Sequence, residues 1–321
     1  MSRNKTIDFF KFAFSVGIIA IHIQFMKNFT PQIYNMTADG LFRMGVPFFF
    51  VVSGYYYYGR IHNNFDTKSY IKKLVKLFLT FTIIESLLYL IVNLWIFTNP
   101  LALLQFILKS IVVGQGGIYW YMFSLILSLV ILTPMWKKKK IKPLLIAGFV
   151  LYLITATNDV YGALFAETFI QKIAKLNTLL FAWPQAGLCS SLMWLSIGAL
   201  LCEYKPQVKN LDLKLGISLV VLVLEALIFK NTGAYDSNCY ISLIYAVPLL
   251  VLFILKHDFI PFETKRLGLM STYMYMAHPI VIIIFRWTLP FLNATNELLF
   301  VLTLIVTTAI SYYLTKSKKT A

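Results

Sequence analysis

Three ionisable side chains lie within one apolar run near the start of the chain, "KTIDFFKFAFSVGIIAIHI" (residues 5–23). Lys11 and His22 are eleven positions apart. In an α-helix this spacing corresponds to about 20° of rotation and roughly 16 Å of rise, so both side chains share one face. Asp8 lies three residues before Lys11, close enough to pair with it. Because hydrocarbon penalises ionisable groups, we expect this face to point toward protein or water.

Two interpretations of this face remain open from the sequence. In the first, it lines a tunnel with a cationic mouth at Lys11 and an imidazole at the end, where His22 can abstract a proton near neutral pH. In the second, Lys11 extends to the membrane surface, Asp8 neutralises it, and His22 donates to a backbone carbonyl. The first interpretation predicts a catalytic histidine, and the second predicts a structural one.

Other polar residues fall in or beside later apolar runs. Arg43 begins the second run at about the depth of His22, where a cation can stabilise an oxyanion or hold an anionic substrate; snorkelling to the interface explains it equally well. Glu85 is expected to pair with a buried cation that the sequence does not identify. His278 is expected near mid-membrane, before Pro279, which frees a backbone carbonyl.

The elements that position these residues are membrane-spanning helices. The chain has 321 residues, of which 59% are hydrophobic and 13% charged, and its mean hydropathy is +0.74. Apolar stretches of about 20 residues recur along the whole chain, which predicts an all-α polytopic membrane protein. We expect about ten transmembrane helices in one membrane domain over residues 1–321, at approximately 7–26, 39–58, 74–97, 118–136, 143–157, 186–203, 215–230, 239–256, 269–287 and 298–315.

Charge sets the expected orientation and partners. Most basic residues fall in alternate connecting segments, which predicts that both termini lie in the cytoplasm. The net charge of +16 therefore does not indicate nucleic acid; the bilayer is the expected partner, and "KKKK" (137–140) suits a solvated membrane surface. The three cysteines have no CxxC spacing and no nearby histidine, so no metal is expected.

Two segments depart from a simple up-and-down pattern. Residues 99–117, "NPLALLQFILKSIVVGQGG", are interrupted by a lysine and end in glycines, so we expect an interfacial or re-entrant helix. Residues 155–185 are more polar and are expected to form the largest external excursion.

The opening motifs resemble those of the acyltransferase-3 family of integral membrane acyltransferases. "IDFFKFAFSVGIIAIH" carries a basic residue, Lys11, with ten residues between it and His22. "GVPFFFVVSGYYYY" matches the family's second-helix pattern through Gly45, Val46, Phe48, Phe49, Ser53 and Gly54. Later stretches are also similar: the basic run "YIKKLVK" with Lys72, Lys73 and Lys76, the aromatic motif that contains Trp120, and "YMYMAHP" with Tyr275 and His278.

This resemblance implies an O-acyltransferase of the bacterial cytoplasmic membrane. It would move an acyl group, usually acetyl from cytoplasmic acetyl-CoA, to a hydroxyl of an extracytoplasmic glycan or other cell-envelope acceptor. His22 would be the catalytic base or an acyl-relay residue, and Arg43 is the expected oxyanion partner. Lys11, where the family more often has arginine, would contact the donor together with Lys72, Lys73 and Lys76; a lysine lacks bidentate phosphate geometry. Asp8, Ser53, Glu85, Trp120, Tyr275 and His278 are expected to support the substrates or the site.

A second function follows from the same resemblance. The membrane parts of vancomycin-resistance serine racemases are similar, and they imply movement of serine or another small molecule through the bundle. The polar residues would then line a substrate path rather than a catalytic tunnel.

Overall fold

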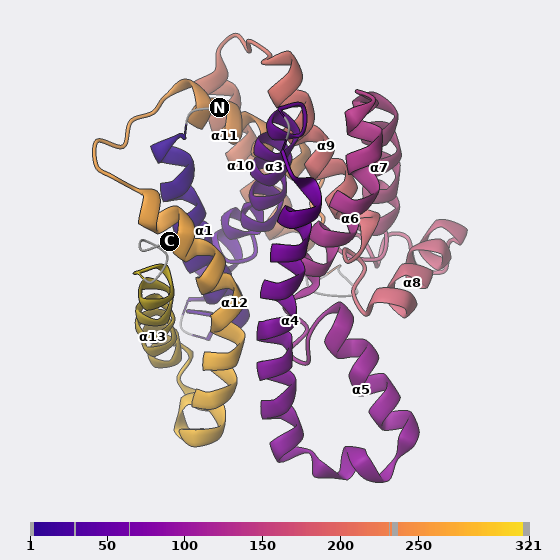
Figure 1. Ribbon diagram of the computed structural model, residues 1–321, viewed down its shortest axis with the longest axis vertical. Coiled ribbons are helices and arrows are strands. Elements are labelled where there is room, and N and C mark those ends of the chain that lie inside the picture. The colour runs from indigo at the N-terminus through magenta and orange to yellow at the C-terminus, as the bar shows by residue number, and fades with distance from the viewer. Residues whose placement is uncertain (1–2, 29, 64, 231, 233–236, 317–321) are drawn as a thin grey trace. The chain divides into compact units, whose positions relative to one another are not determined.

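The computed structural model describes residues 3–28, 30–63, 65–230, 232 and 237–316, and within these ranges it contains helices and no strand. Figure 1 shows their arrangement. The elements are α1 (Lys5–Ile23), α2 (Pro31–Thr37), η1 (Leu41–Met44), α3 (Gly45–Ile61), α4 (Thr67–Val92), η2 (Leu94–Thr98), α5 (Pro100–Val112), α6 (Trp120–Lys137), α7 (Ile141–Ala156), α8 (Phe169–Phe181), α9 (Leu188–Tyr204), α10 (Leu211–Phe229), α11 (Leu243–Lys256), α12 (Lys265–Thr288), η3 (Pro290–Ala294) and α13 (Asn296–Lys316).

Each of the ten expected spans overlaps a helix, but several ends differ. The first helix ends at Ile23 because Gln24 adopts a left-handed conformation with φ 58° and its N–H bonds back to Ala20. Residues 39–44, expected as helix, form a turn and the 3-10 helix η1. The run expected from residue 239 becomes helical only at Leu243.

Among the described residues, five helices are long and apolar enough to cross a membrane: α1, α4, α6, α12 and α13. Several others, including α7, α9 and α11, are shorter apolar helices. The irregular segment 99–117 contains the helix α5 and a glycine-rich turn, and the excursion 155–185 contains α8. An all-helical membrane architecture is therefore what the structure supports.

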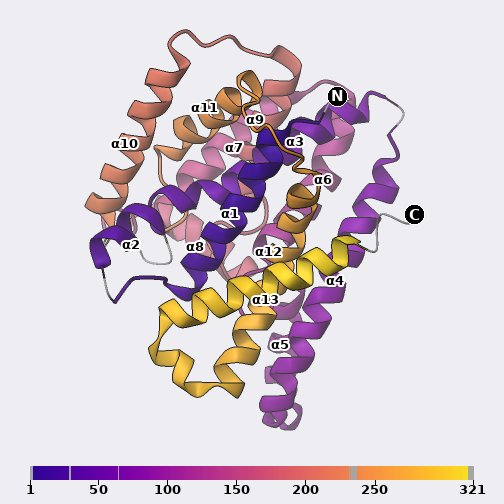
Figure 2. The same ribbon diagram turned by 90° about the vertical axis from the view of Figure 1, so that its left-hand side faces the viewer.

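The chain forms two compact units. Unit 1 comprises Met1–Phe49, Gln207–Asn231 and Ser242–Ala321, and unit 2 comprises Phe50–Pro206 and Thr232–Ile241. In unit 1, α1, α12 and α13 pack on one another, as Figures 1 and 2 show. Their shared core contains Ile19, Ile23, Met274, Ile282, Leu292 and Leu299.

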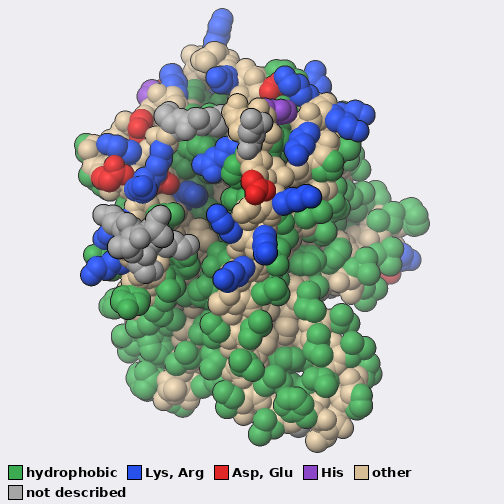
Figure 3. Space-filling model, in the orientation of Figure 1, with side chains coloured by type: hydrophobic (Ala, Val, Ile, Leu, Met, Phe, Trp, Pro, Cys, Tyr) green, Lys and Arg blue, Asp and Glu red, His purple; other side chains and the backbone are tan. Residues whose placement is uncertain are grey.

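In unit 2, α9 packs against α6 and α7, and α4 packs against α5 and α6. Exposed apolar side chains cover the later part of α4 and all of α5, whereas basic side chains gather toward the start of α4 (Figure 3). This surface includes Ile83, Leu87, Ile91, Leu101, Leu104 and Leu108. Since a water-soluble protein rarely exposes so large an apolar surface, the natural solvent of these helices is lipid.

Candidate active site

Helices α1 and α12 bring together residues that lie far apart in the sequence. Three contacts follow the two helices in the same order. Gly268 lies against Asp8, where an added Cβ would come within 1.9 Å of the carboxylate. The Ser15 hydroxyl donates to the Ser271 carbonyl at 3.1 Å, and His22 lies beside His278. The helices therefore run in the same direction, as the expected first and ninth spans would.

The two histidines form the centre of the candidate site. Their ring centroids are 5.4 Å apart and their planes differ by 27°, so the two rings are stacked close to parallel, at a centroid distance typical of interacting aromatic rings. His22 is half-buried, whereas His278 is fully buried. This pair was not predicted, because nothing in the local pattern joins two residues so distant in the chain.

Pro279 helps to fix the His278 ring. A proline inside a helix lacks the N–H that would bond to the carbonyl one turn earlier, here that of Tyr275. The Nδ1 atom of His278 lies 3.1 Å from the Met274 carbonyl oxygen, and the Tyr275 carbonyl also interacts with this imidazole. The Tyr275 ring itself is buried, with its centroid 6.0 Å from that of His278.

Arg43 lies on η1, which packs on α1 through the contact between Phe42 and Gly17. Its side chain is 3% exposed and it pairs with Asp39 at 2.5 Å. This burial is the reverse of what an arginine extended to the membrane surface would show. The sequence reading missed Asp39, although an acidic residue four positions before an arginine is a recognisable pairing signal.

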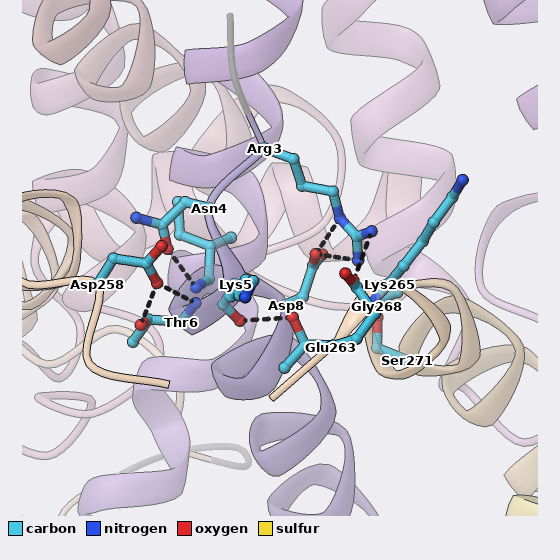
Figure 4. A network of polar contacts seen from close by, with 12 residues as sticks. Arg3, Asn4, Lys5, Thr6, Asp8, Asp258, Glu263, Lys265, Gly268 and Ser271 are labelled. Atoms are coloured by element: carbon cyan, nitrogen blue, oxygen red, sulfur yellow. Dashed lines mark hydrogen bonds and ion pairs between the residues drawn. The ribbon is translucent and has the colours of Figure 1, made fainter. Parts of the chain in front are cut away.

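Asp8 makes its ion pair with Arg3 (Figure 4). Lys11, half-buried and one turn further along α1, adds a Coulombic attraction to this carboxylate. The predicted proximity of Asp8 and Lys11 is therefore present, but Arg3 is the residue that hydrogen-bonds to Asp8. The sequence alone did not single out Arg3.

The start of α1 is tied to the segment between α11 and α12. The Thr6 backbone N–H and hydroxyl donate to Asp258 at 3.1 and 2.8 Å, and the Thr264 hydroxyl donates to the Lys5 carbonyl at 2.9 Å. The Lys265 backbone N–H, which donates to Glu263 at 2.9 Å, holds the pKa of that carboxyl below its ordinary value. Figure 4 shows these contacts around the first turn of the helix.

In unit 2, Glu85 is held by backbone groups, and the cation that attracts its carboxylate is the exposed Lys109 rather than a buried residue. Its buried carboxylate accepts hydrogen bonds from the backbone N–H groups of Gln115 and Gly116, at 2.9 and 3.2 Å. These donors, rather than a cationic side chain, are its hydrogen-bond partners in the turn before α6. The reason is that the glycine-rich turn has no helical partners for its N–H groups, and a buried N–H needs an acceptor.

The other predicted residues of unit 2 lie on three helices. Ser53 of α3 is half-buried and hydrogen-bonds to Tyr121. Trp120, at the start of α6, is buried. Lys72, Lys73 and Lys76 are exposed in the first turns of α4.

Comparison with known proteins decides the family. Residues 4–316 match the family described as "Acyltransferase domain". The chain belongs to the acyltransferase-3 family. The apolar helices and this family together indicate a multi-pass membrane protein.

Two curated relatives carry names of another activity. The chain is 24% identical over 298 residues to an amino-acid racemase of Enterococcus faecalis, and 26% identical over 287 residues to a serine/alanine racemase of Enterococcus gallinarum. These alignments cover 88% and 87% of the chain but 41% of each relative. No solved structure matches the chain.

Within the acyltransferase-3 family, the arrangement in unit 1 has a clear chemical capacity. His22 can take and return a proton, His278 is held beside it, and Arg43 carries a buried positive charge on an element that packs on the same helix. A base and a cation are the groups that acyl transfer to a hydroxyl needs.

Proposed function

We propose that the protein is an O-acyltransferase of the bacterial cytoplasmic membrane, which transfers an acetyl group from cytoplasmic acetyl-CoA to a hydroxyl of an extracytoplasmic glycan or other cell-envelope acceptor. The observation that carries the proposal is the position of His22 on α1, beside a second, buried histidine, in a chain of the acyltransferase-3 family. The resemblance of the two opening motifs to the family supplies the acetyl donor and the hydroxyl acceptor.

In this proposal His22 is the general base. It removes the proton of the acceptor hydroxyl as the oxygen attacks the thioester carbonyl, and Arg43 stabilises the negative charge that develops on the carbonyl oxygen. When the carbon–sulfur bond breaks, His22 returns the proton to the coenzyme A thiolate. A relay through an acyl-histidine is the other route, in which His22 attacks the thioester before the acceptor does.

The donor side requires positive charge because coenzyme A carries phosphates. Lys11, about 16 Å before His22 along the helix, is the proposed donor contact in unit 1. Lys72, Lys73 and Lys76 are exposed cations with the same chemistry in unit 2. The Asp8 carboxylate offsets positive charge near Lys11. We propose a structural role in the site for four further residues: Ser53, Glu85, Trp120 and Tyr275.

The experiment is an assay of acetyl transfer by the purified protein in liposomes. Labelled acetyl-CoA is supplied with a panel of hydroxyl acceptors, and both free coenzyme A and acetylated product are measured. The proposal expects acceptor-dependent release of coenzyme A with one acetyl group transferred per thiol released. Absence of any acceptor-dependent release would count against it.

The names of the two relatives favour a second candidate, a membrane domain that moves serine or a similar small molecule. Both relatives are named racemases, one of them for serine and alanine, and the chain spans 41% of their length. Uptake of labelled serine into proteoliposomes without an acyl donor would support this candidate. Acetyl transfer that needs no serine, together with no uptake of labelled serine, would support the O-acyltransferase.

A further inference from the structure

One ring nitrogen of His278 has no hydrogen-bond partner among the described residues. The side chain is fully buried, and its Nε2 atom is an unpaired polar atom. Its Nδ1 atom lies 3.1 Å from the Met274 carbonyl oxygen. A carbonyl oxygen only accepts hydrogen bonds, so Nδ1 carries the proton and neutral Nε2 presents a lone pair. A buried acceptor without a donor is rare in folded proteins and calls for a specific explanation.

The His22 ring is the neighbouring group with the right chemistry. Its centroid is 5.4 Å from that of His278, and the 27° angle between the planes shows that the two rings are stacked close to parallel. This separation leaves room for one N–H···N hydrogen bond between ring edges after a turn of the half-buried His22 side chain. Helices α1 and α12, which carry the two rings, are themselves packed together in one unit.

We propose that His278 is a positioning residue for His22: its Nε2 accepts the N–H of one His22 nitrogen and thereby leaves the other nitrogen unprotonated toward the acceptor hydroxyl. This inference rests on the proposed role of His22 as the base. When His22 takes the substrate proton, the bond to His278 becomes charge-assisted and therefore stronger. The proton stays on His22, since His278 already holds its own proton on Nδ1.

The same arrangement explains why a histidine, rather than an apolar residue, occupies this buried position. A base that is oriented by a third group is the common plan of activated catalytic residues. Here the Met274 carbonyl fixes the orientation of the His278 ring, and the His278 ring in turn fixes the orientation of the His22 ring, which is the base.

Two substitutions distinguish the hydrogen-bonding roles of the two ring nitrogens of His278. In His278→Asn the side-chain amide keeps a donor at the Nδ1 position for the Met274 carbonyl but lacks an acceptor at the Nε2 position. In His278→Gln the amide oxygen extends to the Nε2 position and restores the acceptor. Thermal unfolding of both variants in the same detergent controls for a loss of folding.

The first test does not depend on acetyl transfer. The chain has four histidines, so nitrogen NMR of protein with labelled imidazoles, assigned with His62→Gln and His257→Gln, can report each tautomer. In the wild-type protein we expect His278 to be protonated on Nδ1 and His22 to adopt a single neutral tautomer. In His278→Asn we expect His22 to become a mixture of both neutral tautomers, and in His278→Gln we expect the single tautomer again. His278 protonated on Nε2, or a His22 tautomer unchanged in His278→Asn, would overturn the inference.

The second test measures turnover. We expect His278→Asn to lower kcat by roughly tenfold to a hundredfold, as loss of an orienting partner does, with the KM values of both substrates unchanged. His278→Gln should regain most of the rate, and His278→Asn added to His22→Ala should cost nothing more. Equal losses in the Asn and Gln variants would contradict the inference. If the wild-type protein transfers no acetyl group, the proposed function fails while the tautomer measurement still decides the role of His278.

Discussion

Gly54 of α3 meets the backbone of α9 at Leu195. A Cβ atom added to Gly54 would lie 2.2 Å from the Leu195 carbonyl oxygen, and one added to Gly198 would lie 2.1 Å from the Val51 carbonyl oxygen. Each helix thus uses a glycine to admit the backbone of the other, which is the way that small residues allow close packing of membrane helices.

This contact predicts that Gly54→Ala destabilises the protein. The added methyl group meets backbone rather than a flexible side chain, so the helices must separate, at a cost of about 1–3 kcal/mol. The matched control is Gly216→Ala on α10, where an added Cβ meets nothing within 4 Å; there we expect a gain of about 0.5–1 kcal/mol from helix propensity. Unfolding in detergent measures both. Equal effects of the two substitutions would contradict the close contact.

Glu85 gives a second prediction about stability. Glu85→Ala leaves the buried N–H groups of Gln115 and Gly116 without their acceptor and should cost about 2 kcal/mol or more. Glu85→Gln keeps one acceptor oxygen and should cost less. Glu167, whose side chain is 81% exposed, provides the control, since Glu167→Gln should change the free energy of unfolding little. A loss in Glu85→Gln as large as that in Glu85→Ala would argue that a charged partner is essential.

The ion pair of Arg3 and Asp8 can be tested by a double-mutant cycle. Arg3 is 37% exposed and Asp8 is 12% exposed on their side chains, so solvent screens the pair and we expect a coupling of about 0.5–1 kcal/mol between Arg3→Ala and Asp8→Asn. The same cycle with Lys5→Ala should give a coupling near zero. A larger coupling for Lys5 than for Arg3 would show that the pair in Figure 4 is not the one that forms in the membrane.

Lys11 provides the test of the donor side. If it contacts the phosphates of coenzyme A, Lys11→Ala should raise the KM for acetyl-CoA about tenfold or more, because a charge-assisted hydrogen bond is lost. The KM for the acceptor should stay the same, and Lys11→Arg should keep most of the affinity. Equal increases for both substrates would assign Lys11 a structural role.

How much of this could be predicted from sequence depends on the distance between the residues concerned. The helices were predicted because runs of apolar residues directly indicate segments that lie in lipid. Pro279 correctly predicted a freed carbonyl next to His278. The helix ends at Ile23 and Leu243 were misplaced, because a left-handed residue such as Gln24 leaves no strong mark in an apolar run.

The site itself was predicted only in part. His22 and His278 were each identified, but their contact depends on which helices pack together, and periodicity within one helix carries no such information. The same holds for Glu85, whose partners are backbone groups of a turn thirty residues later. Asp39 was missed although its spacing of four residues from Arg43 is one that local pairing favours. Arg3 lies five residues before Asp8 and ahead of the first helical residue, so helical spacing gave no signal for that pair.

The most direct measurement of the central claim is the rate of acetyl transfer from labelled acetyl-CoA by His22→Ala, compared with the wild-type protein and with His257→Ala, whose imidazole lies in the segment after α11. With His22 as the base, its removal should lower kcat by about 10²–10⁴-fold while binding of coenzyme A and the rate of His257→Ala remain at wild-type values. Wild-type turnover by folded His22→Ala would contradict the account.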